Sequence, residues 1–459
     1  MKPEDRSRNI DSLTAYIDHA IAEASEHGVG TNDSIITIAK TLKNHIANIK
    51  NGTADATALL EALAAQCSAG DNTRKRHNIS VPSLASEISM PIFTPWKDSS
   101  SHPSSLVKLK TAGGLPVSLG KCLGHGGEGT VYKIQNIPGK VAKVYHEPLK
   151  AQKYNIDEKI RFMTEIKDVA YLDGAHIAAF PEELLYDSNG AFAGYIMPQI
   201  TTSVKLFDVR RDESRRRLFP DLDYRGLIAI AYNLAEVTDH LHRSSVVIGD
   251  MNPSNICVYA DGTVTLIDCD SFHIRSNTGK LFPCRVGLAE ILAPELQTAK
   301  TIASSPISEK SDDFSLAIHI FRLLLNNADP FGFVSTQKIS SHSHPGFDTI
   351  DGILNGECPY FRDLPDKKIP AWVPPLSTLP AYIIELFRRA FGYTAETALT
   401  SVNTRPSAAE WMEVLMKFYQ EPLIQCKNDT FHWYLSALSA CPFCSTNNKS
   451  LCHLPKWSV

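Results

Sequence analysis

The sequence predicts an α+β fold in which a small β-rich lobe is followed by a larger helical lobe. From residue 115 onwards, short runs such as TVYKIQ and KVAKVY are bounded by Gly and Pro, as in an antiparallel meander of hairpins. Segments with helical periodicity follow at 227–242, 312–325, 381–390 and 407–418. With 459 residues the chain is longer than one hydrophobic core usually supports, so we expect two or three domains or one bilobal unit.

The composition is that of an ordinary globular protein. Hydrophobic residues make up 43% and charged residues 21%, and the net charge is −4, so the basic excess of generic nucleic-acid binders is absent. The N-terminus MKPEDRSRNIDS is charged where a signal peptide needs an apolar region, and no stretch reaches the roughly 18 apolar residues of a membrane span. We therefore expect a cytoplasmic protein that does not bind membranes.

Two segments precede the β-rich lobe. Residues 1–67 carry apolar side chains at helical spacing, for example Ile10, Leu13 and Ile17, and we expect them to form a helical region. From 68 to 114 the periodicity vanishes and Ser, Pro and Asn become frequent, which predicts a flexible linker.

A glycine-rich stretch lies between the first two expected strands. Residues 124–131 read GHGGEGTV, and a strand rather than a helix follows. Glycines at a hairpin tip let backbone N–H groups approach phosphate oxygens without obstruction by a Cβ atom. The stretch therefore predicts a lid over a nucleotide, with a flexible hairpin that binds nothing as the alternative.

Lys143 lies inside the apolar strand VAKVY. A buried ammonium group must meet an anion, because leaving it unpaired is costly. Phosphate oxygens and a carboxylate on the next helix are the expected partners, and of the two candidates we favour Glu158 over Glu165. A lysine on an edge strand that extends into water is the alternative.

Further polar residues follow the expected helix 227–242. Asp250 is followed by Asn255, then by a hairpin signal at 260–263, and then by Asp268. Two carboxylates and an amide can converge on one site, where one acid orients an incoming hydroxyl and the other two side chains hold Mg²⁺ on phosphates. Each residue alone would be unremarkable, since Asp and Asn are common in turns.

The order of these motifs resembles that of the protein kinase superfamily. A glycine-rich loop, a strand Lys, a catalytic Asp and Asn, a metal-binding Asp and an Ala-Pro-Glu triplet at 293–295 follow one another as in that family. Asp312 and Arg405 match two further family positions. The resemblance implies a bilobal protein-kinase-like fold over 115–422, in which Glu295 pairs with Arg405 and Asp312 braces the catalytic loop.

The same resemblance implies a division into lobes and a set of site residues. The N-lobe would span 115–197, the hinge 198–200 and the C-lobe 201–422. The residues that would contact ATP are Gly124, Gly126, Gly127, Gly129, Val131, Ala142, Lys143, Glu158, Met197, Pro198 and Ile200. The catalytic residues would be Asp250, Lys143, Asn255 and Asp268, and of these Asn255 and Asp268 would bind Mg²⁺ or Mn²⁺.

Three positions depart from the family pattern. Ile248 and Gly249 stand where the family has His-Arg, which removes the usual partner of a phosphate on the activation segment. Asn252 replaces a Lys beside the transferring phosphoryl group. The metal motif at 268–270 reads Asp-Cys-Asp instead of Asp-Phe-Gly, so the apolar anchor and the glycine hinge are both missing. These changes suggest an atypical kinase with little loop flipping or with reduced activity.

The tail carries a pattern of metal ligands. Cys441 and Cys444 form a CPxC knuckle, which places two thiolates on one tight turn. Zinc needs a second pair of ligands; Cys426 and His432 are the nearest pair upstream, and the Cys-His pair at 452–453 is the rival. We expect a structural Zn²⁺ site, with reduced buried thiols as the alternative.

A kinase domain with a terminal zinc module, here at 423–459, resembles a group of bacterial kinases related to YegI and to the kinases of stress-response triads. The resemblance implies a protein substrate. It also implies two companions, a PP2C-like phosphatase and a von Willebrand A-type protein.

We therefore expect an ATP- and Mg²⁺-dependent kinase that phosphorylates Ser or Thr of proteins, including itself. A nucleotide-binding pseudokinase scaffold is the first alternative, because the positions 248–249, 252 and 268–270 depart from the family pattern. A kinase-fold enzyme acting on a small molecule is the second. The intact Ala-Pro-Glu triplet argues against it, since that region supports peptide docking in the family.

Overall fold

The computed structural model of the chain describes residues 108–146, 154–335 and 345–445. The helices expected over 1–67 and most of the linker expected over 68–114 lie outside these residues. Among the helices within the described ranges, none combines the length and the apolarity that crossing a bilayer requires.

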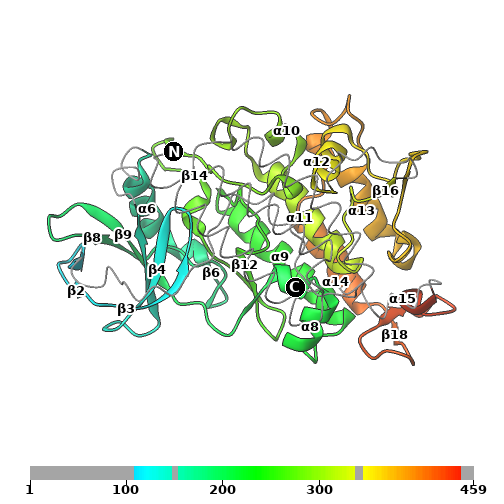
Figure 1. Cartoon of the computed structure of the whole chain (residues 1–459), viewed down its shortest axis with the longest axis horizontal. Helices are drawn as coiled ribbons and strands as arrows, with labels where there is room; N and C mark the ends of the chain where they lie inside the picture. Colours follow the sequence, from blue (N-terminus) through cyan, green and yellow to red (C-terminus); the bar gives the residue numbers. More distant parts are fainter. Residues whose placement is uncertain (1–107, 147–153, 336–344, 446–459) are drawn as a thin grey trace, which may run out of the picture. The chain divides into compact units, whose positions relative to one another are not determined.

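A seven-stranded antiparallel sheet forms the first lobe, with strand order β2-β1-β8-β9-β5-β4-β3 (Figure 1). The strands are β1 (Leu109–Thr111), β2 (Pro116–Val117), β3 (Leu119–His125), β4 (Gly129–Ile134), β5 (Lys140–Tyr145), β8 (Glu183–Tyr186) and β9 (Phe192–Pro198). Helix α6 (Ile156–Glu165) packs against β8 and β9. The expected meander is thus confirmed.

The sheet begins before residue 115, inside the segment that we expected to be a linker up to 114. Strand β1 pairs with both β2 and β8, and Leu109 and Thr111 are buried there. Three residues are too few to show a period in the sequence, so their strand conformation depends on pairing with β8, which lies far away in the chain.

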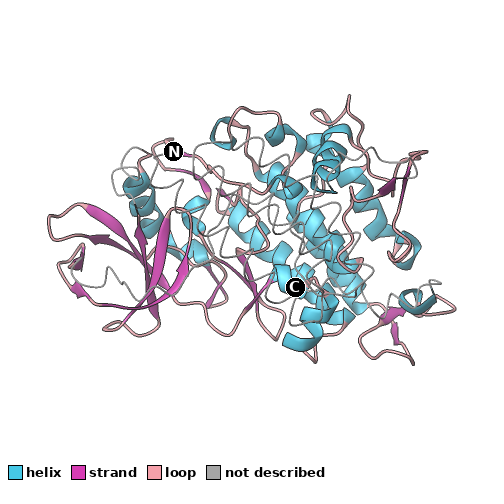
Figure 2. Ribbon diagram, in the orientation of Figure 1, coloured by secondary structure: helices cyan, strands magenta, loops and turns pink. Residues whose placement is uncertain are grey.

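The second lobe is mainly helical, and the helices are separate from the large sheet (Figure 2). Its helices are α7 (Leu206–Val209), α8 (Asp212–Leu218), α9 (Tyr224–Arg243), α10 (Pro294–Gln297), α11 (Glu309–Leu324), α12 (Pro345–Asn355), α13 (Ala381–Phe391) and α14 (Ala408–Gln420). The four helices predicted from periodicity correspond to α9, α11, α13 and α14, and α9 packs against both α11 and α14.

Short strands accompany these helices in small antiparallel sheets. They are β10 (Val204–Lys205) with β12 (Ile256–Val258) and β13 (Val264–Leu266), β11 (Val246–Val247) with β14 (His273–Arg275) and β15 (Leu281–Phe282), β6 (Tyr171–Leu172) with β7 (Ala175–His176), and β16 (Val334–Ser335) with β17 (Lys367–Lys368). The β12–β13 hairpin confirms the turn expected at 260–263 and separates Asn255 from Asp268.

Helix α11 is the buried axis of the helical lobe. Every residue from Ser311 to Leu324 is buried. The aromatic side chains in this part of the core are Phe314, Phe321, Phe331, Phe387, Phe391 and Trp411. A helix that is buried on all sides is usually apolar on all sides, and buried polar groups on it need partners. The polar residues of α11 therefore have structural roles.

Asp312 of α11 holds the loop at 248–255. Its carboxylate accepts hydrogen bonds from the backbone N–H groups of Ile248 (2.7 Å) and Gly249 (2.9 Å), and its Oδ2 lies 3.0 Å from Nε2 of His242. Burial opposes protonation of His242, but the hydrogen bond to Asp312 and the charge of Asp312 together raise its pKa above the usual value. The brace implied by the family resemblance is therefore confirmed.

The same loop has two further constraints. Gly249 has φ +74°, and a Cβ atom there would lie 2.8 Å from Cβ of Cys284, so the Arg of the family pattern does not fit this backbone. Nε2 of His319, from α11, lies 2.7 Å from the carbonyl oxygen of Met251. Burial keeps the pKa of His319 well below its usual value, so the ring is neutral and donates from Nε2.

Arg405 and Glu295 form the ion pair that the resemblance implied. The guanidinium donates to both carboxylate oxygens of Glu295, at 2.7 and 2.8 Å, and also to the carbonyl oxygen of Lys310 at 2.9 Å. Only 1% of Arg405 is exposed, and its guanidinium carbon lies 5.1 Å from the centre of the Phe314 ring. The pair joins α10 to the segment before α14, and the hydrogen bond to Lys310 joins that segment to α11.

Replacing Glu295 by Gln should lower the free energy of unfolding by about 3 kcal/mol, because it leaves a buried guanidinium without its counter-charge. Chemical denaturation of the full chain measures this value. The matched control is Glu385→Gln, since Glu385 and Arg388 form a pair whose side chains are 57% and 60% exposed. That change should cost less than about 0.5 kcal/mol. Equal effects of the two substitutions would contradict the structural role of Glu295.

Candidate active site

The residues expected to contact a nucleotide from strand β5 lie on opposite faces of that strand. Val131 and Tyr195 are the cross-strand partners of Lys143, so the three side chains share one face. Val141, two residues before Lys143, lies on that face as well. Ala142 lies on the other face and is fully buried in a separate cluster with β1, β2 and β8. Ala142 thus faces away from Lys143, so its position does not fit the nucleotide contact predicted for it, whereas Val141 is on the face of Lys143.

Lys143 meets two carboxylates from the segment after β13. Its ammonium lies 2.5 Å from Oδ1 of Asp268, and 2.7 and 2.8 Å from the two carboxylate oxygens of Asp270. The hydroxyl of Tyr145 donates to Asp270 at 2.7 Å. Burial alone would lower the pKa of Lys143, but Asp270 and then Asp268 raise it well above its usual value. The lysine is therefore charged and already paired inside the protein.

The carboxylate expected from the following helix is not the partner of Lys143. Glu158 pairs instead with Lys280, and both side chains are about half exposed. Glu165 is exposed at the end of α6. Both candidates are therefore wrong as partners, and the place given to Glu158 in the nucleotide site is corrected with them. The reason is the rotation of α6, which turns these carboxylates away from the sheet.

The inward face of α6 carries Lys159, together with Ile160 and Met163. Lys159 is buried, and its ammonium donates to the backbone carbonyl oxygen of Asp270 at 2.6 Å. Burial lowers the pKa of Lys159 to about 8. The helix therefore presents a cation where we expected a carboxylate, and Asp270 supplies the negative charge.

Asp250 lies in the loop held by α11 and is largely buried. Its Oδ2 accepts a hydrogen bond from the side-chain amide of Asn255 at 3.2 Å, whereas the buried Oδ1 has no partner within the described part of the chain. Burial and then the negative charge of Asp268 raise the pKa of Asp250 to about 6. An unpartnered carboxylate oxygen beside Asn255 and near Asp268 is suited to accept the proton of a hydroxyl.

The donors expected to hold a divalent cation fit that role. Asn255 uses its amide nitrogen toward Asp250, which leaves its amide oxygen for a cation. The Asp268 side chain is 45% exposed, so its carboxylate is open to a ligand. Oxygen donors of these two kinds are the ligands that Mg²⁺ prefers.

The glycine-rich loop also fits a nucleotide. The N–H of Gly126 donates to the carbonyl oxygen of Gly129 at 2.9 Å and closes the tip of the β3–β4 hairpin. A Cβ atom placed on Gly124 or Gly127 would meet nothing within 4 Å, so the loop backbone is accessible on that side. A Cβ atom on Gly129 would lie 2.8 Å from the carbonyl oxygen of Val144, and the glycine there permits close pairing with β5.

The residues expected to form the hinge are at the end of strand β9 of the same sheet. Met197 and Pro198 are the last residues of β9, and the half-buried Ile200 comes two positions later. The N–H of Gln199 donates to the carbonyl oxygen of Gly139 at 2.9 Å. The connection between the lobes is thus fixed to the β4–β5 turn.

A separate cluster lies near the end of the described chain. The ligand atoms of Cys426, His432, Cys441 and Cys444 all lie within 4.8 Å of one another. Sγ of Cys444 is 3.7 Å from Sγ of Cys426 and 3.5 Å from Nδ1 of His432. Tetrahedral zinc with bonds of about 2.3 Å to sulfur and about 2.0 Å to nitrogen separates its ligands by roughly 3.5–3.8 Å. The cluster fits that geometry, and the rival pair at 452–453 lies outside the described residues.

The cluster is anchored to the helical lobe. It joins a hairpin of β18 (Leu423–Gln425) and β19 (Trp433–Leu435) to the short helix α15 (Pro442–Ser445). Asp429 accepts two hydrogen bonds from Arg216 of α8, at 3.0 and 2.9 Å. Asp429 also lies 3.7 Å from Nε2 of His432. His432 is thus linked through one carboxylate to helix α8.

The sequence contained signals for the site residues that we missed. Val141 follows from the strand period of two, counted back from Lys143. Lys159 lies three residues after Ile156 and four before Met163, and this spacing places it on the apolar face of α6. Asp270 was visible as a third acid in the metal motif, but the family pattern has Gly at that place and assigns it no side-chain role.

The comparisons with known proteins agree with this architecture. Residues 117–369 match the family model described as the protein kinase domain. The chain is 31% identical over 348 residues to protein kinase YegI of Escherichia coli K12, which covers 75% of this chain and 51% of YegI. YegI of E. coli O157:H7 is also 31% identical, over 346 residues and with the same shares. The chain spans about half the length of these curated relatives.

A shorter match links the chain to a protein of Bacillus subtilis. It is 29% identical over 150 residues to a probable serine/threonine-protein kinase, YbdM of Bacillus subtilis, which covers 32% of this chain and 54% of YbdM. The ordered motifs, the two lobes and the family match lead to one conclusion. This chain belongs to the protein kinase superfamily and is similar to YegI.

Proposed function

We propose that the chain is an ATP- and Mg²⁺-dependent kinase that transfers the γ-phosphate to Ser or Thr hydroxyls of proteins, including its own. The observation that carries the proposal is the buried, unpartnered Oδ1 of Asp250, held beside Asn255 and close enough to Asp268 for their charges to interact. The similarity to YbdM, a probable serine/threonine-protein kinase, supports the choice of Ser and Thr.

Each residue has a definite part in this reaction. Asp250 orients the acceptor hydroxyl and receives its proton, and Lys143 holds phosphate oxygens of ATP. A divalent cation held by Asn255 and Asp268 would offset the phosphate charge. The side chain of Asn252 accepts a hydrogen bond from the N–H of Ser254 at 2.9 Å, so it shapes the turn of the loop.

Asp270 is a positioning residue in this proposal. It is 5% exposed and binds Lys143 through both carboxylate oxygens. Because Asp270 and Asp268 belong to the same short turn, one segment places both the phosphate-binding ammonium and a metal ligand. Asp270, which stands where the Asp-Phe-Gly pattern has Gly, would then position Lys143, and this role does not require a glycine hinge.

Incubation of the full chain with radiolabelled ATP and Mg²⁺ should give label on Ser or Thr in phosphoamino-acid analysis. Asp250→Ala and Asp268→Asn should each reduce the rate at least about a hundredfold, because they remove the proton acceptor and a metal ligand. Asp221→Asn, an exposed aspartate before α9, is the control and should change little. If nucleotide raises the melting temperature of the wild type without any labelling, the scaffold alternative is favoured instead.

Asp270→Asn should lower kcat/KM for ATP about tenfold or more, because Lys143 loses the buried one of the two counter-charges that fix its position. Asp270→Glu should recover part of the loss, which a purely structural role would not predict. Glu158→Gln is the matched control and should stay within about twofold of the wild type. Steady-state kinetics with varied ATP measures all three variants. A larger loss in Glu158→Gln would mean that the carboxylate of α6 holds Lys143 during turnover.

We infer that the cluster of Cys426, His432, Cys441 and Cys444 binds a structural Zn²⁺. The interatomic distances support this, and so does the anchoring of the cluster through Asp429 to α8. A closed four-ligand site supplies the folding free energy that so short a segment cannot obtain from a core of its own. The phosphatase and the von Willebrand A-type partner stay predictions from the group resemblance.

Metal analysis of the chain purified without chelator should find about one zinc per molecule. Cys441→Ser should remove most of that zinc and lower the melting temperature, because one of four ligands is lost. Cys122→Ser, in strand β3 of the other lobe, should keep the metal. Absence of zinc from the wild type would refute the site.

A further inference from the structure

Arg210, which follows helix α7, is buried without a full set of hydrogen-bond partners. It is 6% exposed, and its Nε and Nη1 atoms have no partner within the part of the chain that the structure describes. Buried guanidinium groups are almost always paired, because removing their charge from water is costly. The arrangement therefore calls for an anion at Arg210.

The surroundings of Arg210 are more positive than negative. Arg322 of α11 is close and pairs with Asp329, which also accepts a hydrogen bond from the N–H of Phe331 at 2.8 Å. Arg211 adds a third guanidinium, and Glu290 adds a second carboxylate. Burial and then the neighbouring Arg322 lower the pKa of Arg210 to about 9, and the charge of Asp329 acts in the opposite direction.

The cluster lies next to the loop that carries Asp250. The N–H of Phe207, in α7, donates to the carbonyl oxygen of Pro253 at 3.4 Å. The ring of Phe207 lies under Arg211, with the guanidinium carbon 4.0 Å from the ring centre, and Arg210 is 5.8 Å from the same ring. On the other side of that loop, the carbonyl oxygen of Met251 contacts His319. His319 belongs to α11 and lies one turn before Arg322.

The segment before the Ala-Pro-Glu triplet at 293–295 also lies near Arg210. Glu290 belongs to the turn Ala289–Ile291, which contacts α11. Glu290 is close enough to Arg210 for their charges to interact, so this segment, α7 and α11 surround the arginine beside the loop of Asp250. The residues beside the phosphorylated position would therefore run past the arginines.

We propose that Arg210, with Arg322, binds an acidic side chain, Asp or Glu, close to the phosphorylated residue of the peptide substrate. The proposal rests on the proposed kinase function and names its substrate class. A carboxylate accepts from the two terminal nitrogens along one edge of a guanidinium, so the unpaired Nη1 atom of Arg210 would gain a charge-assisted hydrogen bond. A basic peptide would meet like charge and be rejected.

Binding can be measured separately from catalysis. The probes are three fluorescein-labelled peptides that are identical except that Glu, Gln or Lys flanks the central position, where Ala replaces the acceptor. Fluorescence anisotropy with the full chain, dephosphorylated and in Mg-ADP, gives each affinity. The wild type should bind the Glu peptide at least about tenfold more tightly than the Gln peptide, and the Lys peptide most weakly.

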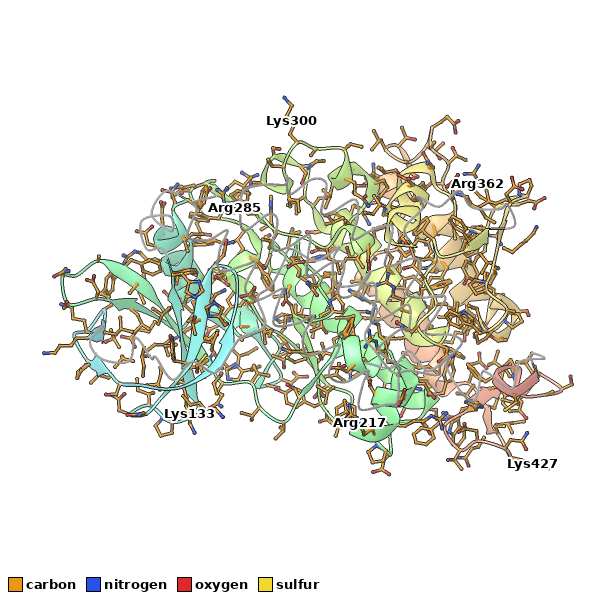
Figure 3. The ribbon with its side chains drawn as sticks, viewed as in Figure 1. Lys133, Arg217, Arg285, Lys300, Arg362 and Lys427 are labelled. Atoms are coloured by element: carbon orange, nitrogen blue, oxygen red, sulfur yellow. The ribbon has the colours of Figure 1, made fainter. Side chains whose placement is uncertain are left out.

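Substitutions at Arg210 then test the residue itself. Arg210→Gln should remove most of the preference for Glu, and Arg210→Glu should shift it toward the Lys peptide, which a misfolded variant would not do. Arg217→Gln is the matched control, since Arg217 is an exposed arginine of α8 near the edge of the molecule in Figure 3. This control should keep the wild-type preference.

Equal binding of the Glu and Gln peptides by the wild type would overturn the proposal. That result is also expected if a phosphate on residues 268–295 of this chain is the true partner of Arg210, because the dephosphorylated chain would then not favour acidic peptides. Labelling of the matching Ser peptides separates the acidic site from the kinase activity. If the chain labels the Ser peptides without a charge preference, the kinase function is supported and the acidic-peptide site is refuted. If the chain binds the Glu peptide selectively but labels no peptide, the site is supported and the kinase function is refuted.

Discussion

The buried ion pair between Lys143 and Asp270 is the interaction on which the two-lobed structure depends. Lys143 belongs to the large sheet, whereas Asp270 follows β13 in the second lobe. The carboxylate also accepts the hydroxyl of Tyr145, and its backbone carbonyl accepts the ammonium of Lys159. Loss of the lysine would leave the Asp270 carboxylate buried without its counter-charge, and loss of Asp270 would leave Lys143 with Asp268 alone; either change is more costly than loss of a surface pair. The strand, helix α6 and the metal-binding turn are thus held as one unit.

This pair explains why the departures from the family pattern occur together. An acid at position 270 allows a cation at position 159, because the carboxylate and the carbonyl of the same residue satisfy both ammonium groups. A carboxylate on the inward face of α6 would instead face Asp270 and repel it. Gly249 fits the same reasoning, since its positive φ and its contact with Cys284 exclude the usual Arg. The changes are therefore compensated locally and need not indicate a decayed site.

Most of the fold could be predicted, because strand and helix periods are local and the motif order is specific. The ion pair of Glu295 with Arg405 and the brace by Asp312 were predicted from the family resemblance and not from the strand and helix periods. The errors at Ala142 and Glu158 concern which face of an element looks inward. For Ala142 the strand period already gave the answer, whereas the rotation of α6 depends on packing against β8 and β9. Strand β1 was missed because three residues are too few to show a period and because it pairs with the distant β8 as well as with β2.

Helix α11 connects the geometry of the reaction to the choice of substrate. Asp312, His319 and Arg322 are separated by seven and three residues, so they lie near one face of the helix. Asp312 and His319 fix the backbone on both sides of Asp250, and Arg322 lies one turn further along, beside Arg210. Because every residue from Ser311 to Leu324 is buried, this face cannot rotate independently. The distance from the phosphorylated hydroxyl to the acidic side chain is therefore set by a rigid helix, and a flexible loop would not impose such a spacing.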